Sequence, residues 1–224
     1  LLHASAANQA RFNLKPIAEE ERRQWLQVAV DRVARLQKNN GAFGLWDRDS
    51  EEDQWLTAYA TDFLLDARDQ GLDVPASLLD KALQRLTFYL NSSGPFIGQP
   101  WSQEPQHYAF ASRAYAAYVL SQVKQAPLGA LRTLYQRDFQ HAKSGLAQVH
   151  LGLALVNMGD QKTGREALQK GVKNIPPINV YLGGYGSPVR DLGQMIHLLL
   201  SHNQLTDEAL DLSLKLRDAT RARQ

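Results

Sequence analysis

The feature of this sequence that most restricts its fold is an apolar pattern of helical period that runs through almost all of its 224 residues. Apolar residues recur three and four positions apart, the spacing that lines one face of an α-helix. In the first predicted helix, residues 18–38, this stripe is Leu26, Ala29, Val33 and Leu36. No segment alternates apolar and polar residues between turn signals, as a half-buried strand does. The sequence therefore predicts an all-α fold.

Further helices follow from the same pattern. They are predicted over residues 54–70, 76–91, 106–124, 128–140, 143–159, 161–173, 188–202 and 206–222. Asp53 and Ser187 stand where helix N-caps are expected, and Ser77 with Asp80 three residues on resembles a capping box. Asp160 separates two helices with almost no linker, so these two are expected to fold back on each other as an antiparallel hairpin.

The predicted helices are of two kinds, which alternate along the chain. Those that are apolar around most of their circumference, as helices buried between neighbours are, cover residues 54–70, 106–124, 143–159 and 188–202. Those with one apolar stripe and a charged outer face, as surface helices have, cover residues 18–38, 76–91, 161–173 and 206–222. This alternation predicts inner and outer layers of helices, either in a closed α/α toroid or in an open α-solenoid.

Three long loops, residues 39–53, 91–105 and 174–187, each join an outer helix to the next inner one. We therefore expect them to gather on one face of the assembly. The aromatic residues that would form a rim there, together with the one histidine that lies beside a loop-to-helix junction, are Trp46, Trp101, Tyr181, Tyr185 and His107. For His107, a structural role as a hydrogen-bonding group at a helix terminus is favoured over a catalytic role.

Composition excludes several kinds of function. The chain has no cysteine, which removes disulfides, thiolate metal sites and cysteine nucleophiles. Its formal net charge of +2 gives no large basic field, so no nucleic-acid partner is expected. No stretch approaches the roughly 18 apolar residues of a membrane-spanning helix. We expect one domain over residues 1–224, excised or processed from a longer chain because it starts at Leu1 without an initiator methionine.

Two motifs have possible functions of a different kind. Gln37, Gly41 and Phe43 fit a Gln-x-x-x-Gly-x-aromatic pattern of α/α toroids, in which the glycine ends a helix and the aromatic ring fills the gap between hairpins.

Residues 47–53 resemble the acidic motifs of terpene cyclases, but Ser50 stands where an aspartate is needed. The Asp-Asp-x-x-Asp magnesium motif and a His-x-x-x-His zinc pair are also missing. We therefore expect no cofactor, no metal and no catalytic residue, and a solvated loop that ends in an N-cap.

The strongest resemblance to a known family lies in the order of several motifs. Gly41-Ala-Phe-Gly-Leu-Trp46, a short polar loop and then Trp55-Leu-Thr-Ala-Tyr59 resemble the thioester domain of α2-macroglobulins and complement thioester proteins. The bacterial branch is indicated by Asp62-Phe-Leu-Leu-Asp-Ala-Arg, by Val74-Pro and by Tyr185-Gly-Ser-Pro-Val-Arg-Asp191. The likeness covers roughly residues 15–205, and its motifs taken together are distinctive.

This resemblance implies an α/α toroid that is incomplete at its N-terminal end and forms the C-terminal majority of a thioester domain. Such domains belong to large periplasmic proteins, often inner-membrane lipoproteins, that serve in host defence. These proteins trap proteases through a Cys–Gln thioester. The partners implied are other macroglobulin domains of the parent chain and target proteases, with membrane contact only through a lipid anchor elsewhere. The Cys-x-Glu-Gln motif would lie upstream of Leu1, so no thioester residue is assigned to this chain.

Two other classes of function remain open on the sequence. One is a toroid enzyme of the terpene cyclase or prenyltransferase type, which requires a ligand-sized cavity with convergent acids. The other is a helical-repeat interaction module, since residues 145–173 resemble one tetratricopeptide unit. A solenoid requires about three such units at a fixed period. The uneven spacing of the inner helices limits the resemblance to one hairpin.

Overall fold

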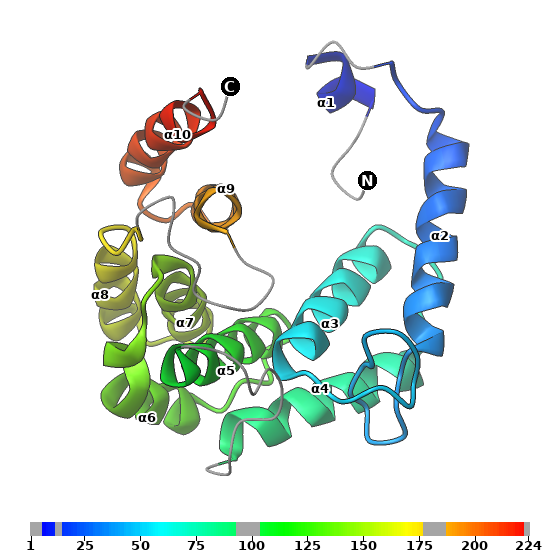
Figure 1. Ribbon diagram of the computed structural model, residues 1–224, viewed down its shortest axis with the longest axis horizontal. Coiled ribbons are helices and arrows are strands. Elements are labelled where there is room, and N and C mark those ends of the chain that lie inside the picture. The colour runs from blue at the N-terminus through cyan, green and yellow to red at the C-terminus, as the bar shows by residue number, and fades with distance from the viewer. Residues whose placement is uncertain (1–5, 12–14, 93–103, 177–186, 222–224) are drawn as a thin grey trace. The chain divides into compact units, whose positions relative to one another are not determined.

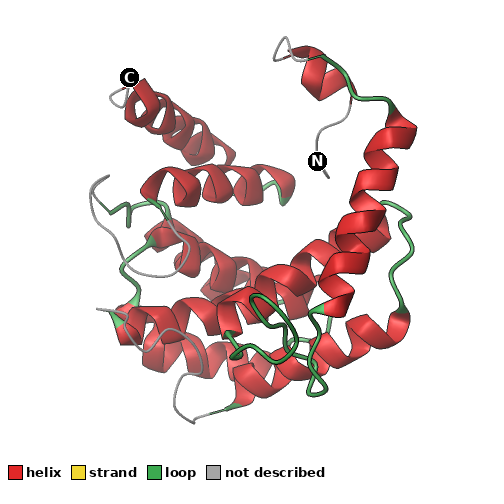
Figure 2. Ribbon diagram, turned by 45° about the vertical axis from the view of Figure 1, so that its right-hand side comes forward, coloured by secondary structure: helices red, strands yellow, loops and turns green. Residues whose placement is uncertain are grey.

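The computed structural model describes residues 6–11, 15–92, 104–176 and 187–221, and all regular structure in these ranges is helical (Figures 1 and 2). The α-helices are α1 (Ala6–Arg11), α2 (Glu19–Arg35), α3 (Gln54–Asp69), α4 (Ala76–Asn91), α5 (Pro105–Gln122), α6 (Leu128–Asp138), α7 (Gly145–Asn157), α8 (Gln161–Gly171), α9 (Pro188–Ser201) and α10 (Thr206–Arg221). A short 3-10 helix, η1 (Phe139–His141), follows α6. The predicted all-α class is confirmed.

Every helix predicted from periodicity is present, with ends that differ by a few residues from the expected ones. Asp53 and Ser187 are confirmed as N-caps, because their side chains accept hydrogen bonds from the backbone N–H groups of Leu56 and Arg190. Asp160, predicted only to separate two helices, also caps α8 by accepting from the N–H of Thr163. Helix α1 was missed, since six residues are too few to show a periodic stripe.

The capping box predicted at Ser77 is wrong. Helix α4 begins at Ala76, two residues earlier than that cap requires, and the carbonyl of Pro75 accepts from the N–H of Leu78. Ser77 therefore lies inside the first helical turn. A serine near a proline is an ambiguous signal, because proline also favours the first positions of a helix.

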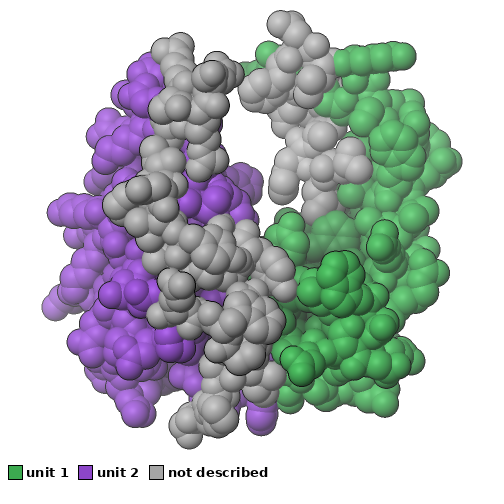
Figure 3. Space-filling model, in the orientation of Figure 1, with its two compact units in different colours: residues 1–85 green, residues 86–224 purple. Residues whose placement is uncertain are grey.

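The chain divides into two compact units, residues 1–85 and residues 86–224, which are described separately (Figure 3). The expectations of one domain over residues 1–224 and of an α/α toroid that is incomplete at its N-terminal end concern the arrangement of both units, and they stay predictions. Among the described residues, no helix combines the length and hydrophobicity needed to cross a lipid bilayer.

In unit 1, the Gln37–Phe43 segment at the end of α2 forms the glycine turn that the sequence pattern predicts, and it is hydrogen-bonded to α4. The Gln37 side-chain amide donates to the carbonyl oxygens of Leu78 (2.9 Å) and Gly41 (3.4 Å). Gly41 has a φ of +89°, and a Cβ there would lie 2.2 Å from the carbonyl oxygen of Lys81. Phe43 is 1% exposed, and its N–H donates to Thr57 Oγ1. Glycine is required at position 41 both for the left-handed turn and for the close approach of the backbone of α4.

In unit 2, α7 lies among other helices. It contacts α5, α6, α8 and α9, and its residues Gly145–Leu155 are all buried. Helix α5 is also buried around most of its circumference, whereas α6 and α8 each bury one stripe. The predicted contrast between buried and surface helices holds for α5, α7 and α8. The prediction for residues 188–202 is wrong, because α9 buries one face against α7 and α10 and leaves Leu200 42% exposed.

Glycines set the distance between α7 and α8. A Cβ at Gly164 would lie 2.6 Å from Val156 Cγ2 and 2.8 Å from the carbonyl oxygen of Gly152. A Cβ at Gly152 would in turn lie 2.8 Å from the Leu168 side chain. The two helix backbones are therefore close enough that a methyl group between them overlaps main-chain atoms, which cannot move aside as a flexible side chain can.

We predict that Gly164→Ala lowers the free energy of unfolding by about 1–2 kcal/mol. Alanine gains about 1 kcal/mol of helix propensity over glycine, but overpacking of a well-packed interface costs about 1–3 kcal/mol, and here a backbone carbonyl is involved. Urea titration followed by circular dichroism measures the change. The matched control is Gly129→Ala in α6, where a Cβ meets nothing within 4 Å. That substitution is expected to stabilise the chain by about 0.5 kcal/mol. An unchanged or stabilised Gly164→Ala protein contradicts the close packing.

Candidate functional site

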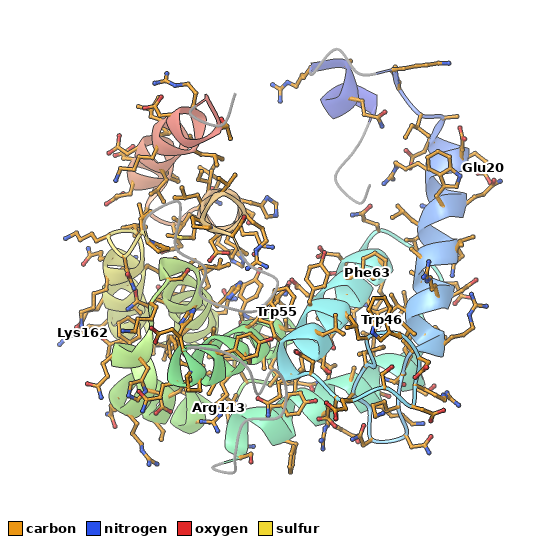
Figure 4. All side chains as sticks on the ribbon, viewed as in Figure 1. Glu20, Trp46, Trp55, Phe63, Arg113 and Lys162 are labelled. Carbon is orange, nitrogen blue, oxygen red and sulfur yellow. The ribbon has the colours of Figure 1, made fainter. Side chains whose placement is uncertain are left out.

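The structure places two of the five residues proposed for an aromatic rim. Trp46 lies on the loop between α2 and α3 of unit 1 and is 82% exposed (Figure 4). His107 lies in the first turn of α5 in unit 2 and is 7% exposed. Trp101, Tyr181 and Tyr185 are outside the described residues. The rim therefore stays a prediction.

The buried His107 is a hydrogen-bonding group at a helix terminus, as the sequence favours. Its Nδ1 accepts a hydrogen bond from the backbone N–H of Lys143, 3.2 Å away, at the start of the segment that leads into α7. Burial lowers the pKa of His107, and the carboxylates of Asp191 and Glu104 oppose that effect. A lone pair on Nδ1 is needed to accept this bond, so the ring is neutral with its proton on Nε2.

The starts of α7 and α9 are joined by a second polar group. Ser144, the N-cap of α7, donates its hydroxyl proton to Asp191 Oδ2 at 2.8 Å and accepts from the N–H of Leu146. The other oxygen of Asp191 accepts from Arg190 Nη2 at 2.7 Å and from Nε at 3.1 Å. This arrangement neutralises the carboxylate and fixes the first turn of α9 against the first turn of α7.

Ser144, Asp191 and His107 do not form a nucleophilic triad. An activated serine needs a base within about 2.6–3.2 Å of its oxygen. The Ser144 proton goes to the carboxylate, and the Nδ1 lone pair of His107 is occupied by the Lys143 N–H. Across the described ranges, no group of three His, Cys, Asp or Glu side chains could hold a metal ion. The cluster therefore positions helix ends and has no arrangement suited to bond cleavage.

The sequence analysis missed a stack of aromatic and imidazole rings behind this network. His150 of α7 stacks on Tyr115 of α5, with ring centroids 4.4 Å apart and planes 2° from parallel. Its ring also stacks on Tyr118 at 5.4 Å, and the Tyr118 hydroxyl lies 3.1 Å from His202 Nε2. The available signal was that His150 is the one histidine inside an otherwise almost wholly apolar helix.

His150 is held neutral by its surroundings. Burial lowers its pKa to about 3, and the positive charge of Arg190 acts in the same direction. A neutral, planar ring between two tyrosines gives dispersion contact comparable to that of an aromatic side chain. Burial also lowers the pKa of His202, with smaller contributions from His197 and Lys124. These histidines are structural members of the core of unit 2.

The acidic loop of residues 47–53 is used for local structure, as predicted. The Asp47 carboxylate accepts from the N–H groups of Asp49 and Ser50 and from the Ser50 hydroxyl, and these bonds lower its pKa. Glu52 accepts from Arg85 Nε at 2.8 Å and from Asn40. Since Asp53 caps α3, three acids of this loop have structural partners. The terpene cyclase alternative gains no support from them.

Sequence comparison finds relatives of one kind. The chain is 37% identical over 215 residues to the α2-macroglobulin of Escherichia coli strain K12, a match that covers 94% of this chain and 13% of that protein. It is 40% identical over 193 residues to the α2-macroglobulin of Xylella fastidiosa strain Temecula1, a match that covers 85% of this chain and 12% of that protein. The chain thus spans about an eighth of the length of these curated relatives. No protein-family model matches it.

Solved structures give the same result. The chain matches native E. coli α2-macroglobulin, from domain MG7 to the C-terminus, with a TM-score of 0.89 and 36% identity over 96% of this chain and 34% of that one. It matches E. coli α2-macroglobulin activated by porcine elastase with a TM-score of 0.93 and 35% identity, covering 100% and 20%. It matches Salmonella α2-macroglobulin reacted with methylamine with a TM-score of 0.90 and 35% identity, over 99% of this chain and 14% of that one.

The buried state of His150 predicts a pH dependence of stability. Its pKa is about 3 in the folded chain and about 6.5 when unfolded, so between these values only the unfolded chain binds the proton. The free energy of unfolding therefore falls as pH drops below about 6.5, by about 2 kcal/mol at pH 5 from this residue. The lowered pKa values of His107 and His202 act in the same direction.

The test is urea unfolding of wild type and His150→Phe at pH 7.5 and pH 5.0, a range in which carboxylates stay ionised. Phenylalanine retains the stack between Tyr115 and Tyr118 but takes up no proton. The variant should lose about 2 kcal/mol less than wild type between the two pH values. Equal losses in the two proteins would show that His150 is not buried in the neutral form.

Proposed function

Because the chain is homologous to a segment of the bacterial α2-macroglobulins, we propose that it is part of a protein that traps proteases covalently through a thioester. Within that protein it would form the C-terminal majority of the thioester domain. The observation that carries this proposal is the match over all 224 residues to the elastase-activated E. coli protein, at a TM-score of 0.93 and 35% identity.

The proposed chemistry is acyl transfer from a thioester between a cysteine sulfur and a glutamine side-chain carbonyl. An amine of the attacking protease, or methylamine, adds to that carbonyl. A new amide bond forms, the carbon–sulfur bond breaks, and the proton lost by the amine ends on the released thiol. Methylamine is a reactant of the matched Salmonella protein, which supports this chemistry for the family.

This chain would contribute the scaffold and not the reacting atoms. It contains no cysteine, so the thioester must be supplied by another part of the parent protein. The residues that the structure brings together, Ser144, Asp191, Arg190 and His107, hold helix starts by hydrogen bonds and charge pairing. These hydrogen bonds and this ion pair hold the helix starts of unit 2 in fixed positions, as a domain that supports a reactive thioester would require.

The remaining parts of the proposal follow from the family. The parent protein would act in host defence from the periplasm, as a lipoprotein attached to the inner membrane. Its partners would be the target proteases and the other macroglobulin domains of the same chain. The function would be inhibition and not catalysis. The relatives bear the name α2-macroglobulin, which supports the inhibitor over a toroid enzyme or a helical-repeat module.

We predict that the parent protein, produced at the length of the matched relatives, gains the mass of one methylamine per chain on incubation with the amine. With elastase it should form a complex that survives denaturing electrophoresis. Both results should vanish when the cysteine of its upstream Cys-x-Glu-Gln is changed to alanine. Intact-mass spectrometry measures the first result and gel electrophoresis the second.

The 224-residue chain by itself is the internal control, because it has no cysteine and should show no mass change with methylamine. A parent protein that lacks Cys-x-Glu-Gln, or never takes up the amine, removes the covalent mechanism. Non-covalent retention of elastase in that case would leave a trap of another kind.

A further inference from the structure

Charge is distributed unevenly between the two units, which the net charge of the whole chain conceals. Residues 1–85 contain 11 Lys and Arg and 14 Asp and Glu, whereas residues 86–224 contain 14 and 9. The excess positive charge of unit 2 is concentrated in residues 128–173, from α6 to the end of α8, with 7 Lys and Arg and 3 Asp and Glu.

The three acids of this segment are already neutralised by ion pairs. Asp160 accepts from Arg132 Nε at 2.7 Å, and Glu166 accepts from Lys170 Nζ at 2.8 Å. Asp138 lies 3.8 Å from Arg113 of α5. The cations that remain are Arg137, Lys143, Lys162, Arg165 and Lys173, all of them exposed and, in the described part of the chain, without an ion-pair partner. Four of them, Lys143, Lys162, Arg165 and Lys173, are called the basic face. Arg137 is left out because it is two positions from Tyr135, whose hydroxyl accepts from Lys170 of α8, and so lies on the opposite side of α6.

Helix α8 carries two members of the basic face, Lys162 and Arg165, on its outer side. They are three positions apart and therefore neighbours on the helix surface, and Lys173 follows two positions after the helix ends at Gly171. The buried residues of α8, Gly164, Ala167, Leu168 and Gly171, lie on the opposite side, against α7. Figure 4 shows Lys162 directed outward from α8.

The two remaining members lie together just beyond the end of α8. Asn174 Nδ2 donates to the carbonyl oxygen of Ala142 at 3.2 Å, which brings Lys143 beside Lys173. Since Lys173 follows the last residue of α8 by two positions, the four cations belong to one surface of unit 2.

We propose that the basic face binds an anionic phospholipid surface. Clusters of four to eight Lys and Arg residues on an amphipathic helix are typical of segments that bind anionic lipids, and each such residue near the membrane surface contributes about 1 kcal/mol. Binding of this kind needs no apolar anchor. The proposal adds a direct membrane contact by this domain to the lipid anchor expected elsewhere in the parent protein.

An acidic protein is a weaker candidate for the partner. Protein–protein interfaces are depleted in lysine and depend on buried aromatic, methionine or arginine anchors. Three of the four cations are lysines, and none of the exposed large hydrophobic side chains of the described chain lies between residues 128 and 176.

The test is co-sedimentation of the chain with vesicles of phosphatidylcholine alone and of phosphatidylcholine with about one-third phosphatidylglycerol. Wild type should bind the anionic vesicles at low ionic strength, should not bind the neutral ones, and should dissociate as salt shortens the screening length. In the variant K143Q/K162Q/R165Q/K173Q, each removed cation should lower the partition coefficient about fivefold, which corresponds to about 1 kcal/mol. Even partial engagement predicts at least a tenfold loss for the four together.

The matched control is R32Q/R35Q/K81Q/K215Q, which lowers the net charge by the same amount at exposed positions outside the basic face. It should bind within about twofold of wild type. Circular dichroism melts confirm that both variants are folded, since all eight side chains are exposed. The proposal is overturned if wild type ignores anionic vesicles at low salt, or if both variants weaken equally. Binding to soluble polyglutamate or to a second copy, without binding to vesicles, would overturn it in favour of an acidic protein or self-association.

Discussion

The close approach of α7 and α8 is the constraint on which the rest of unit 2 depends. Gly152 and Gly164 leave no room for a methyl group between the two helices, so the backbones themselves define the distance. Helix α7 is then held where α5, α6 and α9 can also contact it. Because protein interiors are close-packed, a shift of α7 would disturb each of these interfaces at once.

The polar groups of unit 2 serve this packing. His107 and Ser144 accept hydrogen bonds from backbone N–H groups at the start of α7, which would otherwise lack partners in the helix. Asp191, at the start of α9, accepts from the Ser144 hydroxyl. His150 takes part in a stack of rings and stays neutral because burial penalises its charged form.

The basic face shows how a nearly neutral chain can carry a strongly charged surface. The acids of α6 and α8 and of the turn between α7 and α8 each pair with a neighbouring cation, while the four cations of the basic face are exposed to solvent. Screening by salt acts over distances of about 10 Å, so the local cluster and not the net charge decides what an approaching surface meets. The distribution between units could not be recognised before the boundary at residue 85 was known.

The sequence by itself determined the helices, their caps at Asp53 and Ser187, and the role of Gly41, because helical periodicity and capping involve residues within a few positions of each other. It also pointed to the family, through motifs whose order is a property of the chain. Tertiary structure alone decided that His150 meets Tyr115 and that Ser144 binds Asp191, since these pairs are 35 and 47 positions apart. Such contacts depend on how close α5, α7 and α9 approach, and packing distances of this kind leave no periodic signal in a sequence.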